Sequence, residues 1–336
     1  MTIDRRNLLG MAAVMPAFFA LPSAASAAAD PRRYRVIVDN DLSGDPDGLF
    51  QLAHHLRSTS VEIRAIIGSH LHENEPWGTP GKQAEGSALR AREILERMGM
   101  SGKVPVFAGM EKALGSMQVP PRSAATDAII AEAMRDDPRP LFYCAGAGLS
   151  DLAAAWLIEP RIGKRITLVW IGGQEYEGLG IPVPNASPAE YNLTIDRVAA
   201  QVVFNRSDIV LWQVPRNTYR RMLVGAAELL EMKEHGGLLA WLVGEVEKVW
   251  DMVGKLGMAT GETYVLGDSP LVTLTALQST FEPDPASSDY VVRPCPMIGD
   301  DGLYRANPSG RMIRIYTTID TRVTFGDMVA KLRRKP

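Results

Sequence analysis

The sequence has few cysteines, few aromatic residues and no long apolar segment after its first 30 residues. Cys144 and Cys295 are the two cysteines among 336 residues, which excludes a framework of several disulfides. Cys144 lies in the apolar run 141–145, which is typical of a core strand, so we expect both thiols to be buried and free. Aromatic residues make up 7% of the chain, which gives no indication of a base-stacking surface.

An excess of charge of one sign is also missing. The formal net charge is -3 and the sequence pI is about 6.0. With no basic face, nucleic acid is not an expected partner. The composition is 46% hydrophobic and 22% charged, which is typical of globular proteins. The chain shows no low-complexity linker and no internal repeat, so one large domain over residues 28–336 is predicted.

Residues 1–27 are predicted to be an export signal. Arg5 and Arg6 precede an apolar run from 8 to 21, and Ala25-Ser26-Ala27 offers small residues for cleavage. This pattern resembles a twin-arginine signal, and a general secretory signal is the alternative. We therefore expect a periplasmic protein that has no association with the membrane once the signal is removed.

Apolar runs alternate with helical periodicity along the mature chain. Strands are predicted at 35–38, 61–68, 104–107, 141–145, 166–171 and 209–214, and helices at 49–57, 86–98, 124–135, 149–157 and 196–204. This alternation predicts an α/β fold with a mainly parallel central sheet flanked by helices. The segment 228–259 is predicted to be largely helical. Edge strands are expected near 290 and 312, before a last helix at 325–332.

Four aspartates follow the first apolar strand in the stretch VIVDNDLSGDPDGLFQLAHHL, residues 36–56: Asp39, Asp41, Asp45 and Asp47. Like charges this close resist burial unless a cation neutralises them. Oxygen ligands favour calcium or magnesium over zinc. The stretch follows a strand and lacks the glutamate that ends an EF-hand loop, which excludes that motif. The alternative is a solvated acidic loop at the start of a helix.

Two further polar segments follow later in the chain. Residues 185–196 (NASPAEYNLTID) contain Asn185, Glu190 and Asn192, whose side chains suit the hydroxyl groups of a sugar. The alternative is a loop that caps a helix beginning at Asp196. In residues 266–271 (LGDSPL), Asp268 precedes an apolar helix.

Taken together and in this order, the three segments resemble the inosine-uridine preferring nucleoside hydrolases over nearly the whole mature chain. The most specific part of the resemblance is AlaGluTyrAsn at 189–192 after Gly172-Gly173. The resemblance implies the nucleoside hydrolase fold, bound Ca²⁺ and hydrolysis of the N-glycosidic bond of a ribonucleoside or related riboside. It also implies a small-molecule substrate and a homo-oligomer, either a dimer or a tetramer.

The resemblance also assigns expected roles to individual residues. Asp41 matches the calcium-binding general base, which would take a proton from the attacking water. The other expected calcium ligands are Asp47, the carbonyl of Gly146, and Asp268. Asp45 would contact the sugar or supply a metal ligand. The positions expected to hold ribose hydroxyls are Asn185, Glu190 and Asn192.

Two positions depart from the family pattern. Gly48 stands where a second adjacent aspartate is usual, so Asp45 or Asp47 would have to complete the metal shell. Gly267 stands where family members carry a histidine linked to protonation of the leaving base. His70, in the polar loop 69–82, could protonate a leaving group instead, or it could be an ordinary loop histidine. His72 stands nearby in the same loop.

Two other functions are compatible with parts of the pattern. One is an exported sugar- or nucleoside-binding protein without catalysis on the same fold. The other is a haloacid-dehalogenase-like phosphatase, which also has an Asp-x-Asp after its first strand, here Asp39 to Asp41, and a later Gly-Asp pair. Ser43 stands where such phosphatases have Thr or Val, no lysine is well placed, and AlaGluTyrAsn would be unexplained.

Overall fold

The computed structural model describes residues 32–73, 75, 80–279 and 286–334. Residues 31–336 form one compact unit. The export signal predicted at residues 1–27 lies outside the described residues. Within the ranges that are described, no helix combines the length and the apolar character needed to cross a membrane.

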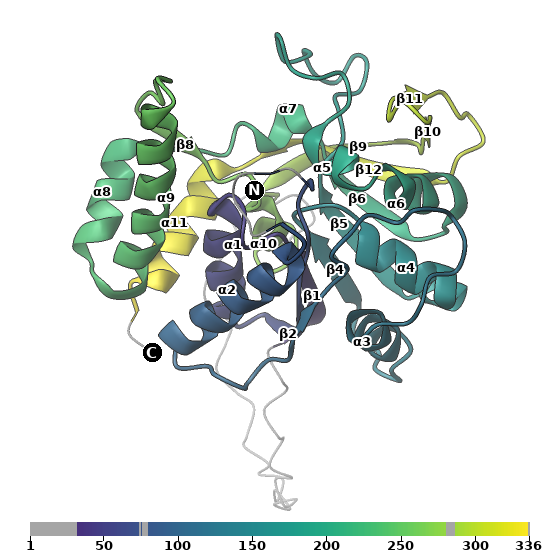
Figure 1. The fold of residues 1–336 in the computed structure, drawn as a ribbon, viewed down its shortest axis with the longest axis horizontal. Helices are drawn as coiled ribbons and strands as arrows, with labels where there is room; N and C mark the ends of the chain where they lie inside the picture. The colour runs from purple at the N-terminus through teal and green to yellow at the C-terminus, as the bar shows by residue number, and fades with distance from the viewer. Residues whose placement is uncertain (1–31, 74, 76–79, 280–285, 335–336) are drawn as a thin grey trace, which may run out of the picture. The chain divides into compact units, whose positions relative to one another are not determined.

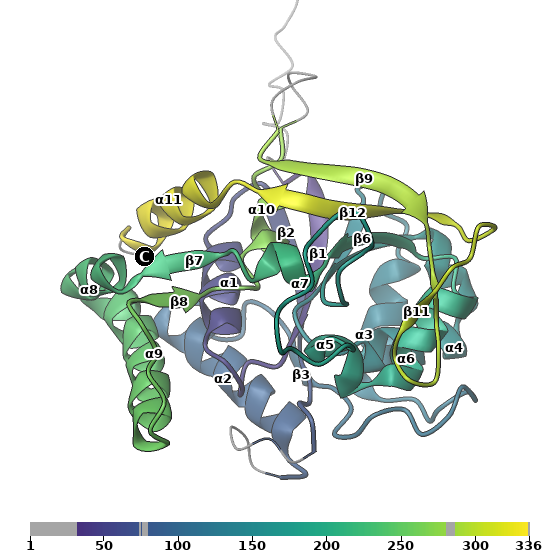
Figure 2. The same ribbon diagram turned by 90° about the horizontal axis from the view of Figure 1, so that it is seen from above.

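A large sheet forms the centre of the described part of the chain (Figures 1 and 2). Its eight strands, in spatial order, are β3 (Val106–Ala108), β2 (Val61–Gly68), β1 (Tyr34–Asn40), β4 (Leu141–Ala145), β5 (Ile166–Ile171), β6 (Val210–Val214), β12 (Met312–Ile319) and β9 (Ser288–Pro294). All neighbours from β3 to β12 pair in parallel, and β9 pairs antiparallel to β12. The predicted mainly parallel α/β sheet is confirmed.

One part of the strand prediction was wrong. Both C-terminal strands were expected at an edge of the sheet. β9 does lie at an edge, but β12 is interior and pairs with β6 and β9. Its pattern of burial, with Ile313, Ile315 and Tyr316 inside, fits a strand that is covered by the rest of the fold.

Helices cover both faces of the sheet (Figure 1). On one face lie α1 (Asp47–Leu56), α2 (Gln83–Arg97) and α11 (Thr321–Leu332), and on the other lie α3 (Ala124–Ala133), α4 (Ser150–Ile158) and α6 (Arg197–Gln201). Consecutive side chains of a strand point to opposite faces. Val36 and Val38 of β1 therefore pack with Phe50 of α1, whereas Ile37 packs with the cluster around Tyr143.

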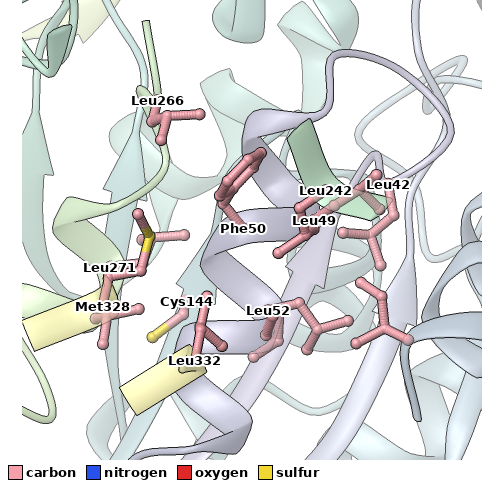
Figure 3. Close-up of a cluster of buried hydrophobic side chains, with 14 of the residues drawn as sticks. Leu42, Leu49, Phe50, Leu52, Cys144, Leu242, Leu266, Leu271, Met328 and Leu332 are labelled. Atoms are coloured by element: carbon pink, nitrogen blue, oxygen red, sulfur yellow. The ribbon is translucent and has the colours of Figure 1, made fainter. Parts of the chain in front are cut away.

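The helix that follows the aspartate cluster is held firmly in the core. Leu49, Phe50 and Leu52 of α1 are buried beside Met328 and Leu332 of α11 (Figure 3). Burying a large apolar side chain stabilises the fold by about 1.5–3 kcal/mol, so this contact fixes the base of the loop that carries the aspartates. Cys144, in the same cluster, and Cys295 are both buried and unpaired, as predicted.

A small antiparallel ribbon forms a separate two-stranded sheet. It consists of β7 (Leu223–Gly225) and β8 (Thr263–Val265), which flank α8 (Ala226–Glu234) and α9 (Gly237–Lys255). The two helices lie side by side (Figures 1 and 2) and account for most of the segment predicted to be helical. After β8, the chain passes through Gly267 and Asp268 into α10 (Pro270–Thr273).

The order of the strands reverses between β1 and β4. From β1 the chain moves outward to β2 and β3, and it then returns to the other side of β1 for β4, β5 and β6. In open parallel sheets, the crevice outside the carboxyl ends of the strands at such a reversal is where ligands bind. The loops that follow β1 and β4 lie at this point.

Candidate active site

A cavity of about 320 Å³ lies at the carboxyl ends of the strands. The residues after β1, β4 and β5 and the segment after β8 line it together with the loop after β2. Its acidic residues are Asp41, Asp45, Asp47, Glu75 and Asp268. A volume of this size lies at the lower end of the range that is usual for small-molecule sites.

The side chain of Asn40, the last residue of β1, forms the floor beneath these carboxylates. It is fully buried. Its amide nitrogen donates to Asp268 Oδ2 at 2.8 Å and to Gln51 Oε1 at 3.2 Å, and its amide oxygen accepts from the Asp41 N–H at 2.9 Å. One amide thus connects the first aspartate segment to Asp268, which lies more than 200 residues later in the chain.

Two glycines make room for the Asn40 amide. A Cβ at Gly146 would lie 2.6 Å from both the nitrogen and the oxygen of the amide, and one at Gly48 would lie 2.9 Å from the nitrogen. Any larger residue at 48 would therefore displace Asn40. This is a physical reason for glycine at the position where a second adjacent aspartate was expected.

Four aspartates share the cavity, and each has a pKa above the usual value, mainly because of burial. Burial raises the pKa of Asp41 and of Asp47 well above the usual range, and the nearby charges of Asp268 and Asp45 add to the effect. Burial also raises the pKa of Asp45, and it raises that of Asp268 to about 7, with Asp45 contributing. The four groups cannot all be ionised here without a compensating positive charge.

The remaining contacts of Asp45 and Asp47 fix their orientation. The hydroxyl of Tyr264 donates to Asp45 Oδ1. The Gly48 N–H donates to Asp47 Oδ1 at 2.8 Å, and the Asp268 N–H donates to Asp47 Oδ2 at 3.2 Å. Both aspartates line the cavity, so the structure brings together the two candidates that the sequence offers for the remaining metal ligand.

Asp39, the first aspartate of the cluster, faces away from the cavity. Its two carboxylate oxygens accept from the hydroxyls of Ser69 and Tyr143. Burial raises its pKa to about 6, against the lowering effect of these two hydrogen bonds. Because consecutive side chains of a strand point to opposite sides, Asp39 lies on the other side of β1 from Asn40, whose amide lies beneath the carboxylates of the cavity.

Asn192 lies in the cavity and Glu190 lies beneath it. The Asn192 amide nitrogen donates to the carbonyls of Gly146 at 3.0 Å and Ile171 at 2.8 Å, so it fastens the ends of β4 and β5 together. Its amide oxygen accepts no hydrogen bond from the described residues and remains able to bind a hydroxyl. The Gly146 carbonyl, a predicted metal ligand, is in this way already shared with Asn192.

Glu190 caps α5 (Tyr191–Ile195) and is fully buried. Its oxygens accept from the N–H groups of Gly173, Asn192 and Leu193 and from the Tyr219 hydroxyl, at 2.6–3.0 Å. It is not among the described residues that line the cavity. A carboxylate with four donors already bound has little capacity left for a ribose hydroxyl, so the structure does not bring Glu190 into its predicted contact role.

His70 and Asn185 also lie away from the described lining of the cavity. His70 is buried, with Nδ1 2.9 Å from the Leu71 carbonyl and Nε2 2.9 Å from Ser150 Oγ. Asn185 is exposed, with a φ of 62°. Neither residue lies where its predicted role, protonation of the leaving group for His70 and contact with ribose for Asn185, would place it, and the contacts with Leu71 and Ser150 hold the His70 ring outside the described lining.

Several lining residues were not predicted as site residues. Tyr191 and Tyr219 supply aromatic surface, and the aliphatic part comes from Leu71, Ile171 and Val265. Tyr191 lies within the AlaGluTyrAsn stretch, and Ile171 ends a strand that the sequence predicts. Both could therefore have been predicted from the sequence as residues near the site. Tyr219 lies in α7 (Arg216–Tyr219), and neither it nor Val265 belongs to any pattern of spacing.

The donors in the cavity suit a hard divalent cation in kind. They are all oxygen atoms, from Asp41, Asp45, Asp47 and Asp268 and from a main-chain carbonyl, which is the ligand set that calcium prefers. Among the described residues, no three His, Cys, Asp or Glu side chains stand in a geometry that would hold a metal ion. The cavity therefore suits calcium in the type and the charge of its ligands, whereas the described side chains do not form a coordination geometry.

The sequence matches a known family over most of its length. The profile of the family described as inosine-uridine preferring nucleoside hydrolase matches residues 36–335. An inosine-uridine preferring nucleoside hydrolase of Leishmania major is 33% identical over 276 residues, which cover 71% of this chain and 81% of the relative.

Solved structures share the fold. A purine-preferring ribonucleoside hydrolase from Gardnerella vaginalis has a TM-score of 0.69 at 16% identity and covers 89% of this chain and 98% of its own. A plant nucleoside hydrolase has a TM-score of 0.68, also at 16% identity, and covers 90% of this chain and 99% of its own. At this identity, the likeness supports the architecture of the sheet and its helices.

Proposed function

The chain belongs to the inosine-uridine preferring nucleoside hydrolase family, whose members are N-glycosyl hydrolases, and on that premise we propose its own reaction. It hydrolyses the N-glycosidic bond of a ribonucleoside or related riboside, with Ca²⁺ bound, and releases the base and ribose. The observation that carries the proposal is the convergence of Asp41, Asp45, Asp47 and Asp268 on one cavity at the reversal of the strand order.

Calcium would be held by Asp41, Asp47 and Asp268 and by the Gly146 carbonyl, with Asp45 beside them. When bound, it would neutralise the carboxylates, help to orient the sugar hydroxyls and increase the acidity of a water molecule. The alternative cation, magnesium, demands stricter octahedral geometry. Carboxylates and a carbonyl that come from separate elements of the fold suit the more adaptable coordination of calcium.

Asp41 is proposed to act as the general base. Burial, and after it the neighbouring carboxylates, raise the pKa of Asp41 and so make it a stronger acceptor for the proton of the attacking water. The water oxygen would add to the anomeric carbon while the bond to the base nitrogen breaks. Attack on the face opposite the leaving base inverts the anomeric centre. The amide oxygen of Asn192 would accept a hydrogen bond from a ribose hydroxyl and hold the sugar in position for this attack.

Replacing Asp41 by asparagine tests the proposal directly. The reaction would be followed by a reducing-sugar assay over a panel of nucleosides, with and without a chelator. A hydrolase should lose turnover by about 100-fold or more in Asp41→Asn while substrate still binds, and the chelator should stop the unsubstituted enzyme. An unsubstituted protein that binds nucleosides without releasing sugar would be a binding protein instead, and release of phosphate from ester substrates would indicate a phosphatase.

Export and assembly are proposed from the sequence and the family resemblance. Residues 1–27 would direct the chain through the twin-arginine route to the periplasm, because Arg5 and Arg6 precede an apolar run and a small-residue cleavage site. Substituting both arginines by lysine should retain the precursor in the cytoplasm, and unchanged export would favour the general secretory route. We expect a dimer or tetramer, which light scattering of the mature protein would test.

A further inference from the structure

The cavity carries more negative charge than one divalent cation can balance. The aspartates at 41, 45, 47 and 268 contribute up to four charges, and Glu75, from the loop after β2, adds a fifth. The other described residues that line the cavity are uncharged. A site of this kind attracts a substrate that itself carries positive charge, because the unbalanced carboxylates and the apolar walls together strengthen the field.

The histidines of the loop that carries Glu75 are engaged outside the cavity. His70 is held between the Leu71 carbonyl and Ser150. His72 has Nε2 3.2 Å from Thr194 Oγ, and its ring packs edge-on against Tyr191 with centroids 4.7 Å apart. Neither ring is in place to give a proton to a leaving base, which ordinary purine and pyrimidine nucleosides need when the glycosidic bond breaks.

The hydroxyl groups of the two lining tyrosines are poor acids here. Burial raises the pKa of Tyr191 and of Tyr219 above the usual range, and the nearby carboxylates Glu75 and Glu190, respectively, add to this. Tyr219 also donates its proton to Glu190 Oε1 at 2.7 Å. Tyr191 instead offers a partly exposed aromatic ring beside Glu75, and an aromatic face next to a carboxylate is a surface that attracts a flat cation.

From these contacts we propose that the preferred substrate is a riboside whose base is cationic before the bond breaks, such as a 7-alkylated purine or an N-ribosylated pyridinium. This deepens the proposed function and rests on it. In the reaction, the water oxygen bonds to the anomeric carbon and its proton passes to Asp41. The electron pair of the glycosidic bond moves to the ring nitrogen and neutralises its charge. The base leaves uncharged, and no proton donor is required.

Three ribosides that share the same sugar separate the proposal from simpler explanations. Guanosine is neutral and needs protonation as it leaves, 7-methylguanosine is cationic at mildly acidic pH, and 4-nitrophenyl riboside is neutral and leaves without protonation. We expect kcat/KM for 7-methylguanosine to exceed that for guanosine by about 100-fold or more, which is the contribution that a missing general acid makes.

Glu75→Gln then tests whether charge, and not leaving-group quality alone, sets the preference. It should lower kcat/KM for 7-methylguanosine by about fivefold, as expected for loss of a partly exposed charge pair, and lower that for 4-nitrophenyl riboside by a clearly smaller factor. Glu73→Gln is the matched control, because Glu73 lies in the same loop but is exposed and outside the described lining of the cavity. It should change neither rate.

The outcomes distinguish the two levels of the hypothesis. If 4-nitrophenyl riboside and both guanosines are all left intact, the proposed hydrolase function fails. If 4-nitrophenyl riboside is cleaved but 7-methylguanosine has no advantage over guanosine, the hydrolase function stands and the cationic preference is overturned. An equal effect of Glu75→Gln on the cationic and neutral substrates would overturn it as well.

Discussion

Replacing Gly146 by alanine should measure how tightly the floor of the cavity is packed. A Cβ at this position would lie 2.6 Å from Nδ2 and Oδ1 of Asn40 and 2.7 Å from its Cγ, well inside ordinary contact distance. Asn40 is fully buried, so it has to move by about 1 Å and give up its bond to Asp268 or to Gln51. Gly146 is not among the residues with positive φ, so the cost comes from this contact and not from the backbone.

The magnitude follows from the contacts that are lost. Inserting a methyl group into a packed interior costs about 1–3 kcal/mol, and a hydrogen bond to a charged group contributes about 1.5–3 kcal/mol. Reduced entropy of the unfolded chain returns about 0.4–1 kcal/mol. We therefore expect Gly146→Ala to lower the free energy of unfolding by about 3 kcal/mol, measured by urea denaturation of the mature protein in the presence of a chelator.

A control and a double-mutant cycle complete this experiment. A Cβ at Gly244 in α9 would lie within 4 Å of no described atom other than the adjacent backbone of its own helix, so Gly244→Ala should stabilise the protein by about 0.5–1 kcal/mol. In an Asn40→Ala background the clash is removed, and Gly146→Ala should cost at least about 1 kcal/mol less than it does alone. An equal effect of Gly146→Ala in both backgrounds would refute the claim that the Asn40 amide fills this space.

Three further predictions concern charge, thiols and metal. Burial raises the pKa of Asp151 from 3.8 to about 8, with Asp39 adding to the effect. The folded state therefore holds this proton more tightly than the unfolded state, and the stability that the protonated group contributes should be lost as pH rises from about 4 through 8. Urea denaturation at several pH values should show a smaller loss for Asp151→Asn. Cys144 and Cys295 are buried and free, so a thiol reagent should label neither in the native protein and both after unfolding; labelling of one or none after unfolding would argue for a disulfide. Calcium at about 100 times its dissociation constant should stabilise the protein by about 2.7 kcal/mol, seen as a higher Tm, and Asp268→Asn should remove most of this gain; an unchanged Tm for the unsubstituted protein would contradict calcium binding.

The continuous apolar runs were the most predictable part of the fold. The strands at 141–145 and 166–171 have the bounds that the sequence predicts, because buried parallel strands are apolar on both faces. The strand at 61–68, which includes Glu62 and Arg64, also has its predicted bounds. The ribbon of β7 and β8 was missed, since three-residue strands contain too few positions to show a period. The predicted helix at 196–204 begins as α6 but continues from Val202 to Arg206 as a π-helix, a change that side-chain pattern does not record.

The candidate site was predictable where backbone direction alone decides the position. Asp41, Asp47, Gly146 and Asp268 follow strands or precede helices at one edge of the sheet, and all of them line the cavity. The sequence could not show that Glu190 lies outside the described lining of the cavity, because its position two residues before Asn192 is equally suited to a helix cap, and backbone N–H groups donate to its oxygens. His70 could not be assigned from sequence, because its partner Ser150 is 80 residues away.

The contact between α1 and α11 has a consequence for synthesis of the protein. Helix α1 anchors the aspartate loop, and Met328 and Leu332 of α11 pack against it. In addition, His54 Nε2 of α1 lies 2.7 Å from Asp327 Oδ2 of α11. A ribosome delivers these residues more than 270 positions after α1, so the helix and the loop before it stay uncovered until that length of chain has emerged. The cavity therefore gains its full support only once α11 has been synthesised, and removal of residues 321–334 should leave a chain that aggregates before it can bind metal or substrate.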